Sequence, residues 1–324
     1  MSIDLKTLTI KKAHEHLSRG DFSATELSES YLKNIETHNK NINAYLEVFD
    51  DVVAQAKEAQ KLIENKKGGI LAGIPIAMKD NILIKGKHAS SASKILEGYT
   101  ATYDATVVKK LKTDGAVFLG RTNMDEFAMG GSTENSAFGA TKNPIDTARV
   151  PGGSSGGSAA ALAMDGALVA LGSDTGGSIR QPAAFCGLVG LKPTYGRVSR
   201  YGLMAMASSL DQIGPFGKTV PDTEILFNAI AGHDPMDSTS VPDEMAKRTK
   251  GNSEAPKHLT IGVPKDIVNS PGIDADVLKN FNEAIAKLKS DGYSIKEISL
   301  PNVHYALSVY YVIMPAEVSA NLAR

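Results

Sequence analysis

The chain has 324 residues, of which 42% are hydrophobic and 22% charged, as in an ordinary globular protein with a sizeable core. Its 35 basic and 36 acidic residues leave a net charge of -1, which disfavours a protein that binds nucleic acid mainly through its own surface. No run of about 18 apolar residues occurs, which excludes a membrane span. The single cysteine, Cys186, excludes an internal disulfide and a Cys-only metal site. We expect a cytoplasmic protein without a membrane partner.

The predicted elements alternate between helices and strands along most of the chain. The first seventy residues read as helical, because Leu27, Tyr31 and Ile35 recur at helical spacing after a possible N-cap at Ser23, and a second periodic segment follows over 51–65. Further patterns predict strands at 73–78, 116–120, 167–171, 260–263 and 294–300, and helices at 104–112 (with Asp104 as cap), 221–231, 274–290 and 305–324. This alternation predicts an α/β fold with helices on both faces of a sheet. The polar stretch 232–258 has no period and is predicted to be a surface excursion.

Most of the 30 glycines lie between Gly115 and Gly217, and two clusters there combine glycine with serine. The segment Gly152-Gly-Ser154-Ser-Gly156 matches the G-x-S-x-G turn of many serine hydrolases, but the downstream histidines are poorly placed to act as its base. The segment Gly172-Ser-Asp-Thr-Gly-Gly-Ser178 follows an apolar strand. Its adjacent glycines allow successive N–H groups to point at one spot, beside the hydroxyl of Ser178. The two clusters together favour a serine nucleophile over a plain glycine-rich turn.

A serine nucleophile needs a base, and Lys79 is the best candidate in the sequence. It ends a short apolar run, whereas most other lysines are typical of an exposed surface. Desolvation at such a position lowers the pKa of a lysine and lets its neutral amine accept a proton. Serine–lysine pairs are an accepted variant of the catalytic triad.

These residues resemble the amidase signature family. The family's blocks appear as Gly152-Gly-Ser-Ser-Gly-Gly-Ser-Ala159, as Gly172–Ser178, and as the lysine of Gly73-Ile-Pro-Ile-Ala-Met-Lys79-Asp80. The resemblance implies a Ser–cis-Ser–Lys triad, with Ser178 as nucleophile, Ser154 as bridging serine after a cis peptide bond, and Lys79 as base. It also implies an oxyanion hole from the backbone N–H groups of Thr175, Gly176, Gly177 and Ser178.

Four further phrases are similar to one subgroup of that family, the glutaminase subunits of tRNA-dependent amidotransferases. They are Asn123-Met-Asp-Glu-Phe-Ala-Met-Gly-Gly-Ser-Thr-Glu-Asn135, Tyr195-Gly-Arg-Val-Ser-Arg-Tyr-Gly202, Ala207-Ser-Ser-Leu-Asp-Gln-Ile-Gly-Pro215 and Asp237-Ser-Thr-Ser240. The resemblance implies that this chain frees ammonia from glutamine and has no cofactor of its own. It implies two partners in a heterotrimer. The B subunit would bind Glu-tRNA(Gln) and use ATP with Mg²⁺ to form Gln-tRNA(Gln), and the C subunit would hold the other two together.

The same resemblance sets the expected domain organisation. Residues 1–324 would form a single amidase signature domain with a mixed twisted sheet, a helical part over 1–70 and a catalytic core over 71–220. Relatives continue beyond this length, so we expect the C-terminal part of the family domain to be missing. Tyr310 resembles a position that contacts the glutamine substrate, although a half-buried helix aromatic is an equally good reading.

Three other functions compete with this one. A stand-alone amidase that hydrolyses a small amide would share the same catalytic blocks. A non-catalytic binding module would have no need of Lys79, Ser154 and Ser178 together. A nucleotide-binding protein would use the glycine-rich loops for phosphate, but no G-x-x-x-x-G-K-[ST] motif is present.

Overall fold

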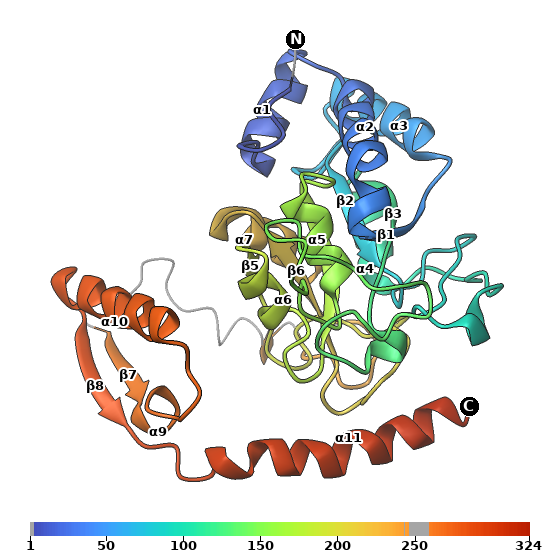
Figure 1. Cartoon of the computed structure of the whole chain (residues 1–324). Coiled ribbons are helices and arrows are strands. Elements are labelled where there is room, and N and C mark those ends of the chain that lie inside the picture. Colours follow the sequence, from blue (N-terminus) through green and yellow to red (C-terminus); the bar gives the residue numbers. More distant parts are fainter. Residues whose placement is uncertain (1–2, 243, 246–258) are drawn as a thin grey trace. The chain divides into compact units, whose positions relative to one another are not determined.

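The computed structural model describes residues 3–242, 244–245 and 259–324, and the chain divides into two compact units. The first unit comprises Met1–Pro242 together with Glu317–Arg324, and the second comprises Asp243–Ala316. Each unit is built around its own sheet (Figure 1).

The first unit contains a six-stranded mixed sheet in the order β1-β3-β2-β4-β6-β5. Its strands are β1 (Tyr45–Val48), β2 (Pro75–Lys79), β3 (Val117–Thr122), β4 (Val169–Asp174), β5 (Val189–Gly190) and β6 (Gln212–Gly217). Strand β2 pairs in parallel with both β3 and β4, whereas β1, β6 and β5 join the sheet by antiparallel pairing. The sheet therefore has a parallel centre and antiparallel edges.

Helices flank this sheet. They are α1 (Ile10–Arg19), α2 (Ala24–Ile42), α3 (Val52–Glu64), α4 (Thr106–Thr113), α5 (Gly156–Ala163), α6 (Arg180–Phe185) and α7 (Val220–Ile230), with 3₁₀ turns η1 (Lys94–Leu96) and η2 (Glu126–Ala128). Every residue of β2, β3, β4 and β6 is buried, so both faces of the central sheet are covered, as parallel strands require. The predicted fold class, an α/β protein with a mixed sheet between helices, is confirmed.

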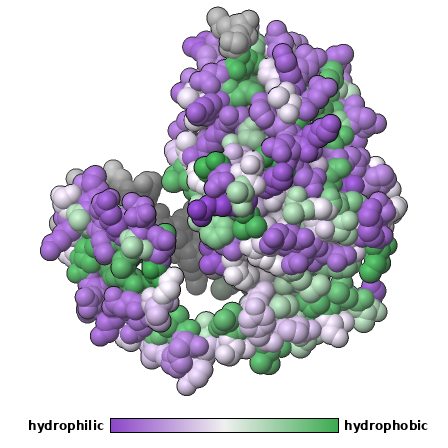
Figure 2. Space-filling view, viewed as in Figure 1, coloured by the Kyte–Doolittle hydropathy of each residue, from purple (hydrophilic) through white to green (hydrophobic). Residues whose placement is uncertain are grey.

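The second unit contains a two-stranded parallel sheet of β7 (Thr260–Pro264) and β8 (Ser294–Ile298). Helices α9 (Lys265–Val268) and α10 (Ala275–Ser290) lie between these strands in the chain, and η3 (Val303–Tyr305) leads to α11 (Ala306–Leu322). None of the residues described between 259 and 316 is fully buried. Apolar side chains such as Val277 and Leu300 are accordingly exposed, and Figure 2 shows apolar and polar residues interspersed on this surface.

The observed elements differ from the predicted ones in several places. Strand β1 interrupts the predicted helical region and pairs with β3, and strand β6 is absent from the prediction because its glycines and Pro215 disfavour a strand. Asp104 does not cap α4: Ala105 holds that position, and Asp104 instead accepts a hydrogen bond from the Lys85 N–H at 2.8 Å.

The predicted surface excursion is described only in part, since 243 and 246–258 lie outside the described residues. Its first part is tied to the first unit, because Asp234 accepts hydrogen bonds from the hydroxyls of Thr106 and Ser199. Of the helices that the structure describes, none combines the length and the apolar character needed to cross a membrane.

Candidate active site

The sheet brings Lys79 and the second glycine–serine cluster to the same edge. Strands β2 and β4 are parallel neighbours, with Met78 opposite Leu171, and they end at Lys79 and Asp174. The carboxyl ends of neighbouring parallel strands lie side by side, which is where open α/β sheets usually carry their sites. Ser173, the last residue but one of β4, is thereby placed next to the lysine.

The Lys79 amine lies among serine hydroxyls inside the protein. Its Nζ is 2.8 Å from Ser154 Oγ and 2.9 Å from Ser173 Oγ, and its side chain has no exposed area. Burial lowers the pKa of Lys79 to about 7, although the carboxylates of Asp125 and Asp174 act in the opposite direction. A large fraction of this lysine is therefore neutral near pH 7 and able to accept a proton.

The segment that contains Ser154 is hydrogen-bonded to the segment that contains Ser178. The Gly153–Ser154 peptide bond is cis, in agreement with the family resemblance. The Ser155 N–H donates to the Ser178 carbonyl at 3.2 Å, and the Gly153 N–H donates to Gln181 Oε1 at 2.9 Å. These hydrogen bonds join the segment of Ser154 to the segment of Ser178, while Ser178 keeps 9% of its surface exposed.

The loop that precedes Ser178 is organised by the buried carboxylate of Asp174. This carboxylate accepts hydrogen bonds from the Gly177 N–H at 2.8 Å and the Ile179 N–H at 3.1 Å. Arg180 also donates to it, through Nε at 3.1 Å and Nη2 at 3.0 Å. Burial alone would raise the pKa of Asp174, but these hydrogen bonds lower it below its usual value, so the carboxylate is charged.

In this structure the Gly177 N–H donates to Asp174. The predicted oxyanion hole, made of the backbone N–H groups of Thr175, Gly176, Gly177 and Ser178, stays a prediction. The side chain of Thr175 has its own anchor, since its Oγ1 donates to Asp211 Oδ1 at 2.6 Å.

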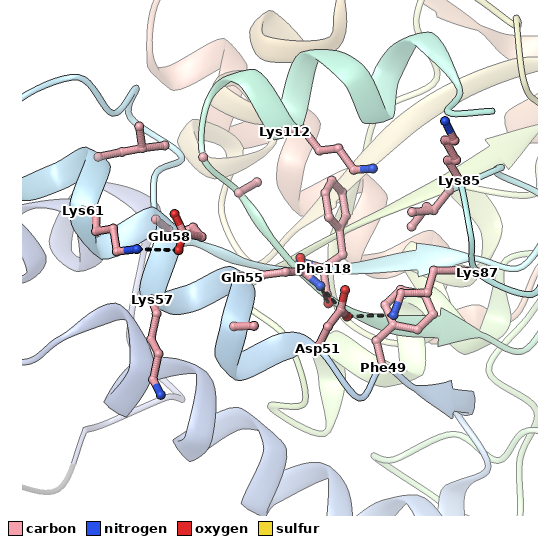
Figure 3. A pocket seen from close by; sticks show the side chains of 16 residues that line it. Phe49, Asp51, Gln55, Lys57, Glu58, Lys61, Lys85, Lys87, Lys112 and Phe118 are labelled. Atoms are coloured by element: carbon pink, nitrogen blue, oxygen red, sulfur yellow. Dashed lines mark hydrogen bonds and ion pairs between the residues drawn. The ribbon is translucent and has the colours of Figure 1, made fainter. Parts of the chain in front are cut away.

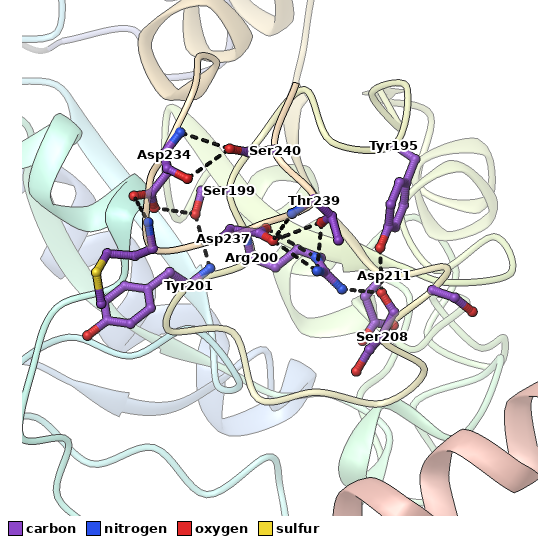
Figure 4. Close-up of polar contacts among 12 residues, drawn as sticks. Tyr195, Ser199, Arg200, Tyr201, Ser208, Asp211, Asp234, Asp237, Thr239 and Ser240 are labelled. Carbon is purple, nitrogen blue, oxygen red and sulfur yellow. Dashed lines mark hydrogen bonds and ion pairs between the residues drawn. The ribbon is translucent and has the colours of Figure 1, made fainter. Parts of the chain in front are cut away.

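Asp211, which accepts from Thr175, lies beside a polar network (Figure 4). Its Oδ2 accepts from the Met206 N–H at 2.9 Å, and burial raises the pKa of the carboxyl. Arg200 lies nearby and binds both carboxylate oxygens of Asp237, at 3.2 and 2.9 Å. The guanidinium also donates to the Ser208 carbonyl, as does the Tyr195 hydroxyl at 2.8 Å. The sequence signals for this network were the phrases Tyr195–Gly202, Ala207–Pro215 and Asp237–Ser240, none of which was assigned a role.

Sequence reasoning also missed two residues that contact the base or its neighbour. Ser173 binds Lys79 directly, and Asn81 Nδ2 donates to Ser173 Oγ at 3.0 Å. Ser173 lies inside the second glycine–serine block and Asn81 follows Lys79 by two residues, but neither pattern carries a chemical signal of its own.

Two other residues were considered from the sequence. Tyr310 belongs to α11 and lies in the second unit, whereas Lys79, Ser154 and Ser178 belong to the first, and its contact with the substrate stays a prediction. Cys186 is buried, which raises the pKa of its thiol to about 12 and makes it unreactive. Within residues 3–242, 244–245 and 259–324, no cluster of His, Cys, Asp or Glu could hold a metal ion.

A cavity of about 590 Å³ lies between α3, α4 and the loop at 84–87 (Figure 3), and none of Lys79, Ser154 and Ser178 lines it. Its floor is apolar, with Phe49 and Phe118, and several lysines surround it. Carboxylates already pair three of these lysines: Lys61 with Glu58, Lys87 with Asp51 and Lys112 with Asp104. Its lysine charge is therefore largely neutralised.

Comparison with known proteins identifies the architecture. The family model described as Amidase matches residues 26–324. The chain is 53% identical over 324 residues to the A subunit of glutamyl-tRNA(Gln) amidotransferase from Carboxydothermus hydrogenoformans, covering 99% of this chain and 67% of that protein. The same-named protein of Desulfatibacillum aliphaticivorans is 52% identical, with 99% and 66% covered. The chain thus spans about two thirds of the length of these relatives.

Solved structures give the same picture. The A subunit of the same amidotransferase from Thermotoga maritima superposes with a TM-score of 0.86 at 43% identity, covering 99% of this chain and 68% of that one. The peptide amidase of Stenotrophomonas maltophilia superposes with a TM-score of 0.85 at 29% identity, covering 98% and 67%.

Proposed function

Because this chain belongs to the amidase family, we propose that it is the glutamine-hydrolysing subunit of a glutamyl-tRNA(Gln) amidotransferase. The observation that carries the proposal is the 2.8 Å contact between the buried Lys79 amine and the Ser154 hydroxyl, next to the Ser178 segment. A lysine whose pKa is lowered to about 7 is suited to act as a base at neutral pH.

In the proposed reaction, Ser178 is the nucleophile and Ser154 carries its proton to the base. Ser178 Oγ attacks the side-chain amide carbon of glutamine, its proton passes to Ser154, and the Ser154 proton passes to neutral Lys79. The proton then returns through Ser154 to the amide nitrogen, and the carbon–nitrogen bond breaks to release ammonia. Water hydrolyses the resulting γ-glutamyl ester by the same relay, which gives glutamate and restores Ser178.

The negative charge on the amide oxygen would be stabilised by backbone N–H groups of Thr175, Gly176, Gly177 and Ser178. Loss of one such donor typically lowers the rate about 10²–10³-fold. The anchoring of this loop by Asp174 and Asp211 supports the role, because fixed donors need no reorganisation during the reaction.

The partners follow from the same proposal. The ammonia would be used by a B subunit that binds Glu-tRNA(Gln) and consumes ATP with Mg²⁺, and a C subunit would complete the heterotrimer. The net charge of -1 supports this division of work, since a chain without a basic excess leaves nucleic-acid contact to a partner. The chain itself would need no cofactor, and the assembly would work in the cytoplasm.

Two further assignments belong to this proposal. Residues 71–220 would be the catalytic core of one amidase domain spanning 1–324, which is supported by the presence of Lys79, Ser154 and Ser178 in that range. Tyr310 would contact the glutamine substrate.

A second candidate is a partner-free amidase, favoured by the TM-score of 0.85 to a peptide amidase. The higher identity to the amidotransferase subunits, 53% against 29%, argues for the first candidate. The two differ in substrate, since a stand-alone amidase would hydrolyse other small amides as readily as glutamine.

The test is to purify the chain gently from its own source, to identify any bound partners by their mass, and to measure its hydrolysis of glutamine. We expect native mass spectrometry to find one large and one small partner, and ammonia release from glutamine that disappears in Ser178→Ala. A lone chain that prefers other amides would support the second candidate, and full ammonia release by Ser178→Ala would exclude the assigned nucleophile.

A further inference from the structure

The Lys79 amine has more neighbours than the triad requires. Besides Ser154, it contacts Ser173 Oγ at 2.9 Å and the Ser173 carbonyl oxygen at 3.5 Å. Ser173 is itself fixed, because the Ser155 hydroxyl donates to its carbonyl at 3.0 Å and its N–H donates back to Ser155 Oγ at 3.3 Å. Among the residues that the structure describes, Ser173 Oγ has two hydrogen-bond partners, Lys79 and Asn81.

Ser154 and Ser173 compete for the lone pair of the Lys79 amine, because that amine has few protons to donate. A neutral lysine amine has two N–H donors and one lone pair. The Ser173 carbonyl can only accept, so it takes one N–H. The other N–H and the lone pair are shared between the hydroxyls of Ser173 and Ser154. Lys79 can accept the Ser154 proton only if Ser173 accepts, rather than donates, at the amine.

Asn81 decides which of these arrangements holds. With Asn81 Nδ2 donating to Ser173 Oγ, that oxygen can still accept an N–H of Lys79 through its second lone pair, but the Ser173 proton then has no acceptor other than the Lys79 lone pair, for which it competes with Ser154. With the amide turned by half a rotation, Asn81 Oδ1 accepts the Ser173 proton, and Ser173 must accept from Lys79. The two ends of an amide have nearly the same shape, so both orientations fit the same space. Asn81 Oδ1 is buried and has no partner within the described residues, so it is available as this acceptor.

We propose that Asn81 is a positioning residue that accepts the Ser173 proton through Oδ1 and thereby directs the Lys79 lone pair toward Ser154. The inference rests on the proposed triad, because it assumes that Lys79 is the base for Ser154. Ser173 then acts only indirectly. Its hydroxyl leaves the Lys79 lone pair available when Asn81 accepts the Ser173 proton, and it occupies that lone pair when Asn81 cannot accept the proton.

The test compares Asn81→Leu, Ser173→Ala and the double variant in the full chain. The rate of covalent labelling of Ser178 by a fluorophosphonate probe reports activation of the nucleophile and needs no glutamine. Ser158→Ala is the matched control, because Ser158 is a buried serine whose hydroxyl donates to the Leu171 carbonyl at 3.0 Å and binds Thr122 at 2.8 Å. Thermal unfolding of each variant separates loss of fold from loss of positioning.

We expect Asn81→Leu to be labelled about tenfold more slowly, a fraction of the ~10²–10⁴-fold effect of a whole base. Ser173→Ala should stay within about threefold of the wild type, and the double variant should return to the rate of Ser173→Ala, because removal of Ser173 removes the competing proton. A double variant slower than Asn81→Leu would overturn the proposal. A Ser173→Ala variant labelled as slowly as Asn81→Leu would also overturn it. If Asn81→Leu does not fold, a Ser173→Ala variant labelled about tenfold more slowly than the wild type would overturn it instead.

The outcomes also separate this inference from the proposed function. Labelling that follows the expected pattern, in a chain that releases no ammonia from glutamine, would uphold the inference and contradict the glutaminase role. Ammonia release from glutamine, together with a double variant labelled no faster than Asn81→Leu, would uphold the glutaminase role and contradict the inference. Absence of labelling in the wild type would overturn the triad and this inference with it.

Discussion

The Lys79 amine lies 2.8 Å from the Ser154 hydroxyl, and neither side chain is exposed to solvent. Water does not solvate a charge on the amine at this position, so burial favours the neutral form. The same burial protects the contact from competing water molecules. The proposed base and its proposed proton source are therefore adjacent before any substrate binds.

The first prediction concerns pH. Because the pKa of Lys79 is lowered to about 7, the amine is protonated and inactive at lower pH and neutral at higher pH. The rate of Ser178 labelling should rise with pH through about 7 and then level off. Lys79→Ala should lose this dependence together with most of the rate, about 10²–10⁴-fold. A wild-type profile that is flat from weakly acidic to weakly alkaline pH would contradict Lys79 as the base.

The second prediction concerns the anchor of the oxyanion loop. Thr175→Val removes the hydroxyl that donates to Asp211 at 2.6 Å while it keeps the shape of the side chain. The loop should lose part of its fixed geometry, and kcat/KM for amide hydrolysis should fall about tenfold, less than the loss of a whole oxyanion donor. Thr175→Ser keeps the hydroxyl and is the matched control. Equal activity of the two variants would show that this contact does not position the loop.

The third prediction concerns Arg180, whose side chain is 53% exposed and can therefore be replaced without leaving a cavity in the core. Arg180→Met removes both side-chain hydrogen bonds to Asp174 and should raise the pKa of that carboxyl, because these bonds hold it low. We expect kcat to fall about tenfold through a looser loop at 175–178, with a larger loss toward acidic pH. Steady-state kinetics across pH would measure this, and an unchanged pH profile would refute it.

The fourth prediction concerns stability. Arg121 Nη1 lies 2.9 Å from the fully buried Asp80 carboxylate, and its Nε lies 2.7 Å from Glu47. Arg121→Met would leave the Asp80 carboxylate without its cation, and the free energy of unfolding should fall by about 3–5 kcal/mol. Arg149→Met is the control, because the Arg149–Asp146 pair is exposed and should contribute less than about 1 kcal/mol. Urea unfolding of both variants would settle the comparison, and equal losses would contradict the buried-pair explanation.

The elements with a strong period or a clear cap were predictable from sequence. The N-terminus of α2 is one example, because Ser23, a residue type that favours the N-cap position, forms a capping box with Glu26. The strand that ends at Lys79 is another, because its apolar run has no competing pattern. Strand β6 could not be predicted, since its conformation depends on pairing with β4 rather than on local preference.

The residues of the candidate site likewise divide into those that could be predicted from the sequence and those that could not. Lys79, Ser154 and Ser178 were found from chemistry-bearing residues in recognisable blocks. Asn81 and Asp211 were not, because each acts through a contact made only when distant segments meet. Asp211 reaches Thr175 across 36 positions, and Asn81 reaches Ser173 across 92. The hydrogen bond from the Gly177 N–H to the Asp174 carboxylate could not be predicted from the sequence either, since it depends on how the loop closes.

The most direct test of the central claim is to trap the acyl-enzyme. The protein, purified with its natural partners, is mixed with glutamine, quenched in acid within one turnover, digested and mapped by mass spectrometry. We expect one γ-glutamyl group in ester linkage to Ser178, absent from Ser178→Ala. An ester on Ser154 or another residue, or ammonia release with no ester at all, would contradict it.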